Sequence, residues 1–210
     1  MVGFRHMIGW LLLGGVIVVS AGAAVLGVSQ SPKPAPLLTA VSNTLSASSY
    51  TEVGGQNSGQ GQQTFHLVYH APDRLGGYIQ SGDRRSYVFA IGTSYYQSVT
   101  VPTSTPLRRL TFYRQDNPGG VPSVDPAQNL RYATQAKHVS QSGDTFSFTV
   151  TKMGQTGTFT YTVSGQYVSH FTFTVGNASL ELSISGVGTS PTVRLPAGAK
   201  VVGPPPAAAG

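Results

Sequence analysis

The chain has 210 residues, of which 40% are hydrophobic and 10% charged, and it contains 26 Gly, 14 Pro and no Cys. This length suits one domain plus an appended segment, and the lack of Cys excludes disulfides, thiolate metal sites and cysteine nucleophiles. The net charge of +6 is the difference between 13 Lys or Arg and 7 Asp or Glu, so few acids are available for acid–base chemistry.

The N-terminal segment has the length and composition of a membrane span. Residues 8–28 carry no charged side chain, and a helix of this length crosses about 30 Å of hydrocarbon. Because Arg5 precedes it, we expect residues 1–7 in the cytoplasm, a signal anchor over 8–28 and an extracytoplasmic remainder. The alternative is a signal peptide cleaved near the A-x-A motif at Ala21–Ala23, which leaves a secreted or periplasmic protein. Both interpretations predict export.

The exported part begins with a Pro-rich linker at residues 29–36, followed by one domain over 37–202 and a low-complexity tail at 203–210. Apolar residues at helical spacing predict an amphipathic helix over 37–49. The Gly- and Gln-rich stretch from Gly54 to Gln63 is typical of a mobile turn.

From residue 64 onward the apolar period changes to two, which is the period of β-strands. Short Gly, Ser and Asp clusters separate the alternating segments and predict an antiparallel meander. Asp125-Pro126 is a helix-start signal, and apolar spacing behind it predicts a second helix over 127–139. The predicted strands cover residues 64–70, 75–80, 85–91, 94–100, 107–114, 145–151, 157–164, 167–175 and 179–185.

The strands share an unusual alternation of aromatic or aliphatic residues with Ser, Thr, Gln and His. We expect the apolar positions to form one face, larger than two short helices can cover, and surplus apolar concavity is the usual form of a ligand site. The predicted fold is mainly β, an α+β half-open antiparallel barrel with two helices as a lid. The predicted apolar ligand-binding residues are Phe65, Leu67, Tyr69, Tyr87, Phe89, Ile91, Leu110, Phe112, Phe146, Phe148, Phe159, Tyr161, Phe171, Phe173 and Leu182.

Three short motifs occur within this order of elements, namely APDR (Ala71–Arg74), IGTSYY (Ile91–Tyr96) and P-x-V-x-L-P (Pro191–Pro196). Together with the order of elements they resemble the LolA/LolB-like lipoprotein-carrier superfamily, and most of all its actinobacterial lipid-binding lipoproteins. The resemblance covers about residues 37–202, and it implies an unclosed β-barrel that holds acyl chains of lipids or lipoproteins. Members of that branch are tethered through a lipidated Cys, which this chain lacks.

No motif for catalysis, metal binding or a cofactor stands out, so we expect a protein that is not an enzyme. The pattern G-x-S-x-G is absent. His66 and His70 are four apart in a strand, which separates them by about 13 Å. A carboxylate pair would have to be drawn from acids that mostly occupy turns, namely Asp73, Asp83, Asp116, Asp125, Asp144 and Glu181.

Two arginine doublets, Arg84-Arg85 and Arg108-Arg109, are predicted to bind anionic lipid head groups at the rim of the cavity. A solvated basic surface is the alternative, and nucleic acid is excluded as a partner by export. The predicted function is therefore a membrane-tethered, extracytoplasmic lipid-binding domain. Two alternatives stay open: a sensor or interaction domain of the same fold with an envelope protein as partner, and an adhesion-type β-sandwich.

Overall fold

A computed structural model of the chain describes residues 35–58, 61–152 and 155–203. The predicted signal anchor at residues 8–28, most of the linker and most of the tail lie outside these ranges. In the described ranges, no helix has the length and apolarity needed to cross a membrane.

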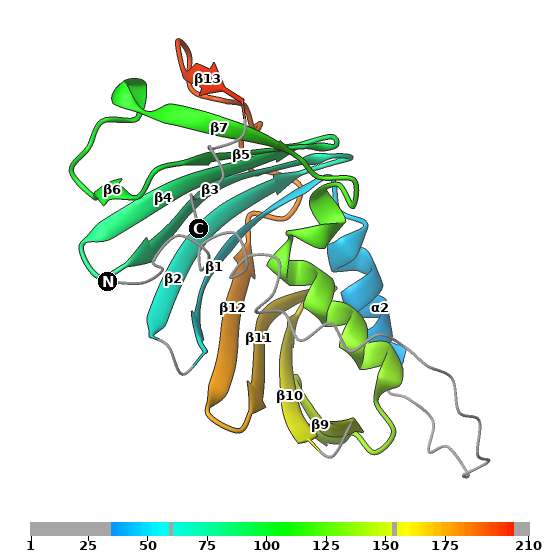
Figure 1. Cartoon of the computed structure of the whole chain (residues 1–210). Helices are drawn as coiled ribbons and strands as arrows, with labels where there is room; N and C mark the ends of the chain where they lie inside the picture. The colour runs from blue at the N-terminus through cyan, green and yellow to red at the C-terminus, as the bar shows by residue number, and fades with distance from the viewer. Residues whose placement is uncertain (1–34, 59–60, 153–154, 204–210) are drawn as a thin grey trace.

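One open sheet of 13 strands forms the body of the domain, and it is visibly curved (Figure 1). Its order is β13-β7-β5-β4-β3-β2-β1-β12-β11-β10-β9-β8, and β6 pairs with β4 beside this path. The pairs are antiparallel apart from β13, which lies parallel to β7. The two edge strands, β13 and β8, do not pair with each other, so the sheet is neither a closed barrel nor a two-sheet sandwich.

The predicted meander is present, and the structure adds four strands to it, namely β1 and the short β6, β8 and β13. The strand predicted over 107–114 begins only at Thr111, because Leu107–Arg109 form a turn of 3₁₀ helix. The strands are β1 (Ser49–Asn57), β2 (Gln62–His70), β3 (Arg74–Ser81), β4 (Arg84–Ile91), β5 (Ser94–Ser98), β6 (Val101–Pro102), β7 (Thr111–Asp116), β8 (Ser140–Ser142), β9 (Thr145–Lys152), β10 (Gln155–Ser164), β11 (Tyr167–Val175), β12 (Ala178–Ser185) and β13 (Lys200–Val202).

Two helices, α2 (Ala35–Leu45) and η3 (Pro126–Gln135), lie side by side over one face of the sheet (Figure 1). We call this face the inner face. The second helix was predicted over 127–139, but it is a 3₁₀ helix that ends at Gln135. Two single turns of 3₁₀ helix, η1 (Leu107–Arg109) and η2 (Val121–Ser123), lie in the Pro-rich connections.

The central strand β1 was missed from the sequence, because its second half lies in the stretch predicted as a mobile turn. Gly54 explains why glycine occurs in the middle of a strand here. A Cβ at this position would lie 2.7 Å from the Phe65 ring and would collide with the Glu181 carbonyl. The glycine therefore leaves room for an aromatic side chain of β2 to lie flat against β1.

The sheet buries two separate cores, one on each face. The inner core lies beneath α2 and η3 and takes residues from all the long strands. The smaller outer core lies on the opposite face of β3–β7, where the chain segment after β12 covers it. Its buried members are Phe89, Leu110, Phe112 and Val193.

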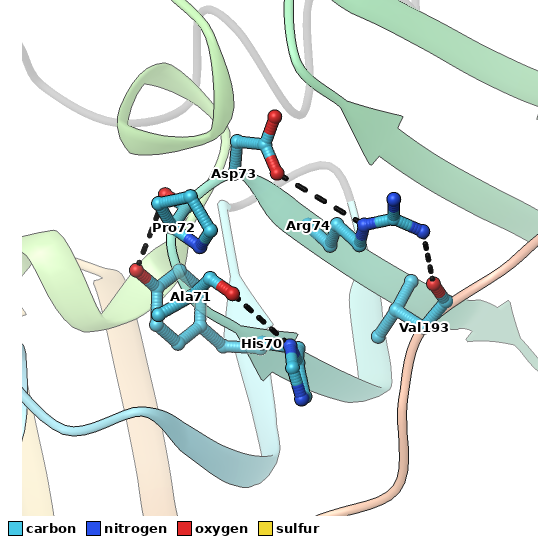
Figure 2. Close-up of polar contacts among 7 residues, drawn as sticks. His70, Ala71, Pro72, Asp73, Arg74 and Val193 are labelled. Atoms are coloured by element: carbon cyan, nitrogen blue, oxygen red, sulfur yellow. Dashed lines mark hydrogen bonds and ion pairs between the residues drawn. The ribbon is translucent and has the colours of Figure 1, made fainter.

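The APDR motif, Ala71–Arg74, forms the turn between β2 and β3 and binds this covering segment (Figure 2). The Arg74 guanidinium donates a hydrogen bond to the Val193 carbonyl at 3.2 Å. Asp73 lies 4.0 Å from Arg74, and this ion pair is half-exposed. The motif thus fastens the C-terminal segment over the outer core, which is a structural role.

Candidate functional site

The inner face of β9, β10 and β11 carries a stack of aromatic rings. Phe148 and Phe159 stack with ring centroids 5.2 Å apart, and Phe159 and Phe173 stack at 4.5 Å. Tyr132 of η3 covers this stack, with its ring 5.1 Å from Phe159 and 6.5 Å from Phe173. The alternation of Phe with Thr or Ser in these strands puts the rings on one face and the hydroxyls on the other. The stack is therefore an apolar surface held between the sheet and the second helix.

The stack is buried at one side and half-exposed at the other. Phe148 and Phe159 are buried, whereas Phe173 and its neighbour across the strand pair, Leu180, remain partly exposed. Tyr132 is also half-buried. We call these three half-buried side chains (Tyr132, Phe173 and Leu180) the apolar margin. It is the place where apolar surface of the inner core meets solvent.

Ten of the predicted ligand-binding residues lie on the inner face as expected, and all of them belong to or pack against the inner core. Most of them are buried among one another and beneath the helices. They are Phe65, Leu67, Tyr69, Phe146, Phe148, Phe159, Tyr161, Phe171, Phe173 and Leu182.

The other five predicted residues lie on the opposite face, so the expectation of one shared face was wrong. Phe89, Leu110 and Phe112 are buried in the outer core, and Tyr87 packs against it. Ile91 follows the same alternation in β4. The error arises in β4, where five apolar residues follow one another from Tyr87 to Ile91, so alternation cannot tell its two faces apart. Val88 and Ala90 are the β4 residues of the inner core.

The two predicted arginine doublets lie at the same end of the sheet, but their side chains differ in exposure and in contacts. Strand β6 pairs with β4 at Arg84 and Arg85, and η1 with Arg108 and Arg109 follows β6 along the chain. Arg84, Arg108 and Arg109 are exposed. Arg85 is half-buried, and its guanidinium lies 3.8 Å above the centre of the Tyr78 ring on the outer face. Arg85 is thus already engaged, and Arg84, although exposed, donates a hydrogen bond to the Thr100 carbonyl at 2.9 Å.

A buried carboxyl pair lies where η3 meets the sheet, and it was not predicted. Glu52 of β1 is 0% exposed and Asp125, the N-cap of η3, is 4% exposed. The Ala127 backbone N–H donates to both, to Glu52 Oε1 at 3.0 Å and to Asp125 Oδ1 at 3.0 Å. The predicted list of paired carboxylates contained Asp125 but omitted Glu52. The burial of Glu52 could have been inferred from the alternation in β1. Tyr50, Glu52 and Gly54 lie on the same face as the apolar residues of β2 that pair with them.

The surroundings of the pair favour neutral groups. Burial raises the pKa of Glu52 well above its ordinary value, and the negative charge of Asp125 raises it further, whereas the hydrogen bond from Ala127 lowers it. Burial and the same two carboxylates raise the pKa of the Tyr50 hydroxyl, which donates to Asp125 Oδ2 at 2.7 Å. The site therefore holds a protonated tyrosine and a carboxyl group with a strong tendency to keep its proton.

The first helix is joined to the sheet by one buried hydroxyl. Thr44 of α2 accepts a hydrogen bond from the Val168 backbone N–H at 2.9 Å and donates to the Ala40 carbonyl at 2.8 Å. On the second helix, the Tyr161 hydroxyl donates to the Leu130 carbonyl at 3.3 Å. Both helices are thus held by few polar contacts and by apolar packing.

The described ranges contain no group of three or more His, Cys, Asp or Glu side chains that could hold a metal ion. His66 and His70 lie on the outer face of β2, away from the carboxyl pair. His66 stacks on Tyr78 with ring centroids 5.6 Å apart. What the site offers chemically is apolar surface, hydroxyls and a buried carboxyl pair.

No known protein-family profile matches the chain, and no curated protein sequence matches it. Among solved structures, the crystal structure of lipoprotein LppX from Mycobacterium tuberculosis is similar, with a TM-score of 0.48 and 13% identity over 76% of this chain and 97% of LppX. LprF from Mycobacterium bovis is similar with a TM-score of 0.48 and 11% identity, over 78% of this chain and 95% of LprF.

Proposed function

We propose that this domain binds the acyl chains of a lipid, or of a lipoprotein, between the inner face of the sheet and the helices α2 and η3. The observation that carries the proposal is the aromatic stack that continues into the half-exposed apolar margin. Apolar surface beside solvent is where a lipid tail gains most from burial, at about 25 cal/mol for each Å² removed from water. A binding function without a catalytic step is part of the proposal.

The way the helices are attached supports the same proposal. The hydrogen bonds of a 3₁₀ helix have poorer geometry than those of an α-helix, and runs longer than three or four residues are uncommon. The helix η3 has ten residues, and Tyr132 covers the stack from it. A displacement of η3 exposes the rings of β9–β11 without breaking a strand pair. A lipid tail can then take the place of Tyr132.

We further propose that the domain lies outside the cytoplasm and is tethered by the segment at residues 8–28. A tethered domain handles lipid locally, at the membrane that holds it. The exposed Arg84, Arg108 and Arg109 supply positive charge for an anionic head group. The proposed head-group site at these arginines depends on the proposed acyl-chain site, and the same experiment tests both.

An interaction or sensor domain of the same fold is the second candidate. Its support is that Phe146, Tyr161 and Phe171 are fully or nearly fully buried by the protein's own side chains. An inner face filled in this way needs no cargo. In that case the partner is an envelope protein, and a purified domain carries no lipid.

The direct test is to purify residues 32–210, which comprise every described element, and to identify bound lipid in an organic extract by mass spectrometry. We expect a lipid in stoichiometric amount, or its uptake from vesicles that contain labelled phospholipid. A folded domain that carries no lipid and takes none up contradicts the proposal. Recovery of a stoichiometric envelope protein instead supports the second candidate.

A matched pair of substitutions separates ligand binding from folding. Phe173→Arg places a charge in the apolar margin and is expected to abolish uptake, because a bound acyl chain would bury this charge without a partner. Val53→Arg is the control, since Val53 is also a β-strand residue but is 47% exposed and points to the outer face. Loss of uptake in both variants alike, with both folded, contradicts a site on the inner face.

A further inference from the structure

Glu52 and Asp125 form the polar contact between the central strand β1 and the start of η3. Neither of the two ion pairs in the described ranges includes them. Two ionised carboxylates that share one N–H donor without a cation would repel each other strongly inside the protein. The arrangement is therefore stable only when the pair holds a proton.

The hydrogen bonds indicate which carboxyl group holds it. Asp125 accepts from three donors, the Ala127 N–H, the Tyr50 hydroxyl and the Gln128 side-chain amide at 3.0 Å. Glu52 accepts from one donor at Oε1, and its Oε2 is buried without a hydrogen-bond partner. Three donors stabilise a carboxylate, whereas a buried carboxyl oxygen without a donor disfavours the charged form. We therefore assign the proton of the pair to Glu52.

We propose that Glu52 and Asp125 share one proton and form a latch that holds η3 on the sheet in acid and loosens it as the pH rises. A protonated Glu52 puts no second negative charge beside Asp125, and both carboxyl groups accept from the Ala127 N–H at the start of η3. Loss of the proton leaves two buried negative charges at the contact. The repulsion is relieved when the N-terminus of η3 moves away from β1 and water reaches both groups.

The sign follows from the surroundings of Glu52. Burial and the charge of Asp125 hold its pKa well above the ordinary value of 4.5, so the latched state binds the proton more tightly than the open state. The stabilisation is complete below about pH 4.5 and is lost as the pH rises through the raised value. The titratable groups that face the pair are Tyr50 on β1 and Tyr69 on β2, and α2 contains none. Both tyrosines have raised pKa values and stay neutral in this range.

The latch is tested by hydrogen exchange, measured on the full chain in non-ionic detergent from about pH 5 to about pH 8. Protection factors, which correct for the intrinsic pH dependence of exchange, are compared between peptides of η3 and of β10. In the wild type we expect protection of η3 to fall by up to about tenfold per pH unit over the titration. In Glu52→Gln it stays constant, because the amide is a neutral donor at every pH. Glu181→Gln, at an exposed carboxylate, behaves like the wild type.

A second variant keeps the test decisive if Glu52→Gln does not fold. Asp125→Asn retains an N-cap residue but removes the negative neighbour, so the fall in η3 protection becomes smaller and moves to lower pH, because burial alone still raises the Glu52 pKa. Protection that is independent of pH in the wild type overturns the latch. So does an equal pH dependence in the wild type and in both variants. The opening of η3 is measured without lipid, so the test of the latch does not depend on whether the domain binds lipid. Only the effect of the latch on lipid access rests on the proposed function.

Discussion

The two halves of the sheet differ in how many faces they bury. Strands β9–β11 bury Phe and Tyr on the inner face only, and their other face carries Thr and Ser that bond to one another, such as Ser147 with Thr160 at 3.2 Å. Strands β3–β5 bury both faces, because Leu75, Val88 and Tyr95 belong to the inner core and the C-terminal segment covers the opposite face at Val193. One half is therefore covered on both faces, whereas the other packs its apolar face against the helices α2 and η3 and carries hydroxyls on its second face.

The largest effects are expected from the buried rings of the two halves. Phe112→Ala in the outer core and Phe171→Ala in the inner core each remove a ring from a fully buried position. Both are expected to cost about 3–5 kcal/mol of unfolding free energy, measured by denaturant titration. Only Phe171→Ala should change lipid uptake by the folded fraction. An equal change in uptake for both variants would show that the two halves do not have separate functions.

An intermediate effect is expected where α2 is joined to β11. Thr44→Val keeps the shape but leaves the Val168 N–H without an acceptor. A buried unsatisfied donor costs about 1–3 kcal/mol. Denaturation measures this cost, and limited proteolysis should show faster cleavage within residues 35–45. Unchanged stability would mean that apolar packing alone holds the helix.

A smaller effect is expected at the C-terminal segment of the half that is covered on both faces. Arg74→Ala removes the hydrogen bond to the Val193 carbonyl, and because Arg74 is half-exposed we expect a loss of about 1 kcal/mol. Proteolysis should become faster in the segment from residue 186 to 199, with lipid uptake unchanged. A loss of uptake in this variant would assign a ligand role to the APDR turn.

The smallest effect is expected on the solvated face of the half that carries the aromatic stack. Thr174→Val changes an exposed side chain on β11 and should alter the unfolding free energy by no more than about 0.5 kcal/mol. Denaturant titration beside the wild type measures it. A cost as large as that of Thr44→Val would mean that the hydroxyl face is not merely solvated.

This difference between the halves also explains what the sequence could predict. In β9–β11 the alternation of aromatic residues with Thr marks one face, and the predicted inner residues Phe146 to Phe173 are placed correctly. In β4 the run from Tyr87 to Ile91 is apolar on both faces, so the phase was misassigned. When both faces of a strand are buried, its residues are apolar at every position. The sequence then does not indicate which residues face the inner core and which face the outer core.

Two further features depend on contacts that local patterns do not contain. Strand β1 has glycines because Phe65 of the next strand lies over Gly54, and glycine alone predicts a turn. The contact between Glu52 and Asp125 could not be predicted from the sequence. In the chain 72 residues lie between the two, and Glu52 lies in β1, the strand that was not predicted. The N-cap role of Asp125 was local, and it was predicted correctly.

The most direct test of the central claim, that acyl chains lie against the inner face, is photo-crosslinking with a phospholipid that carries a photoreactive group in its tail. After irradiation, the modified peptides are identified by mass spectrometry. The account predicts adducts at the apolar margin, on the peptides that contain Tyr132, Phe173 and Leu180. Adducts confined to outer-face peptides such as the one with Val53, or none on a folded domain, would contradict it.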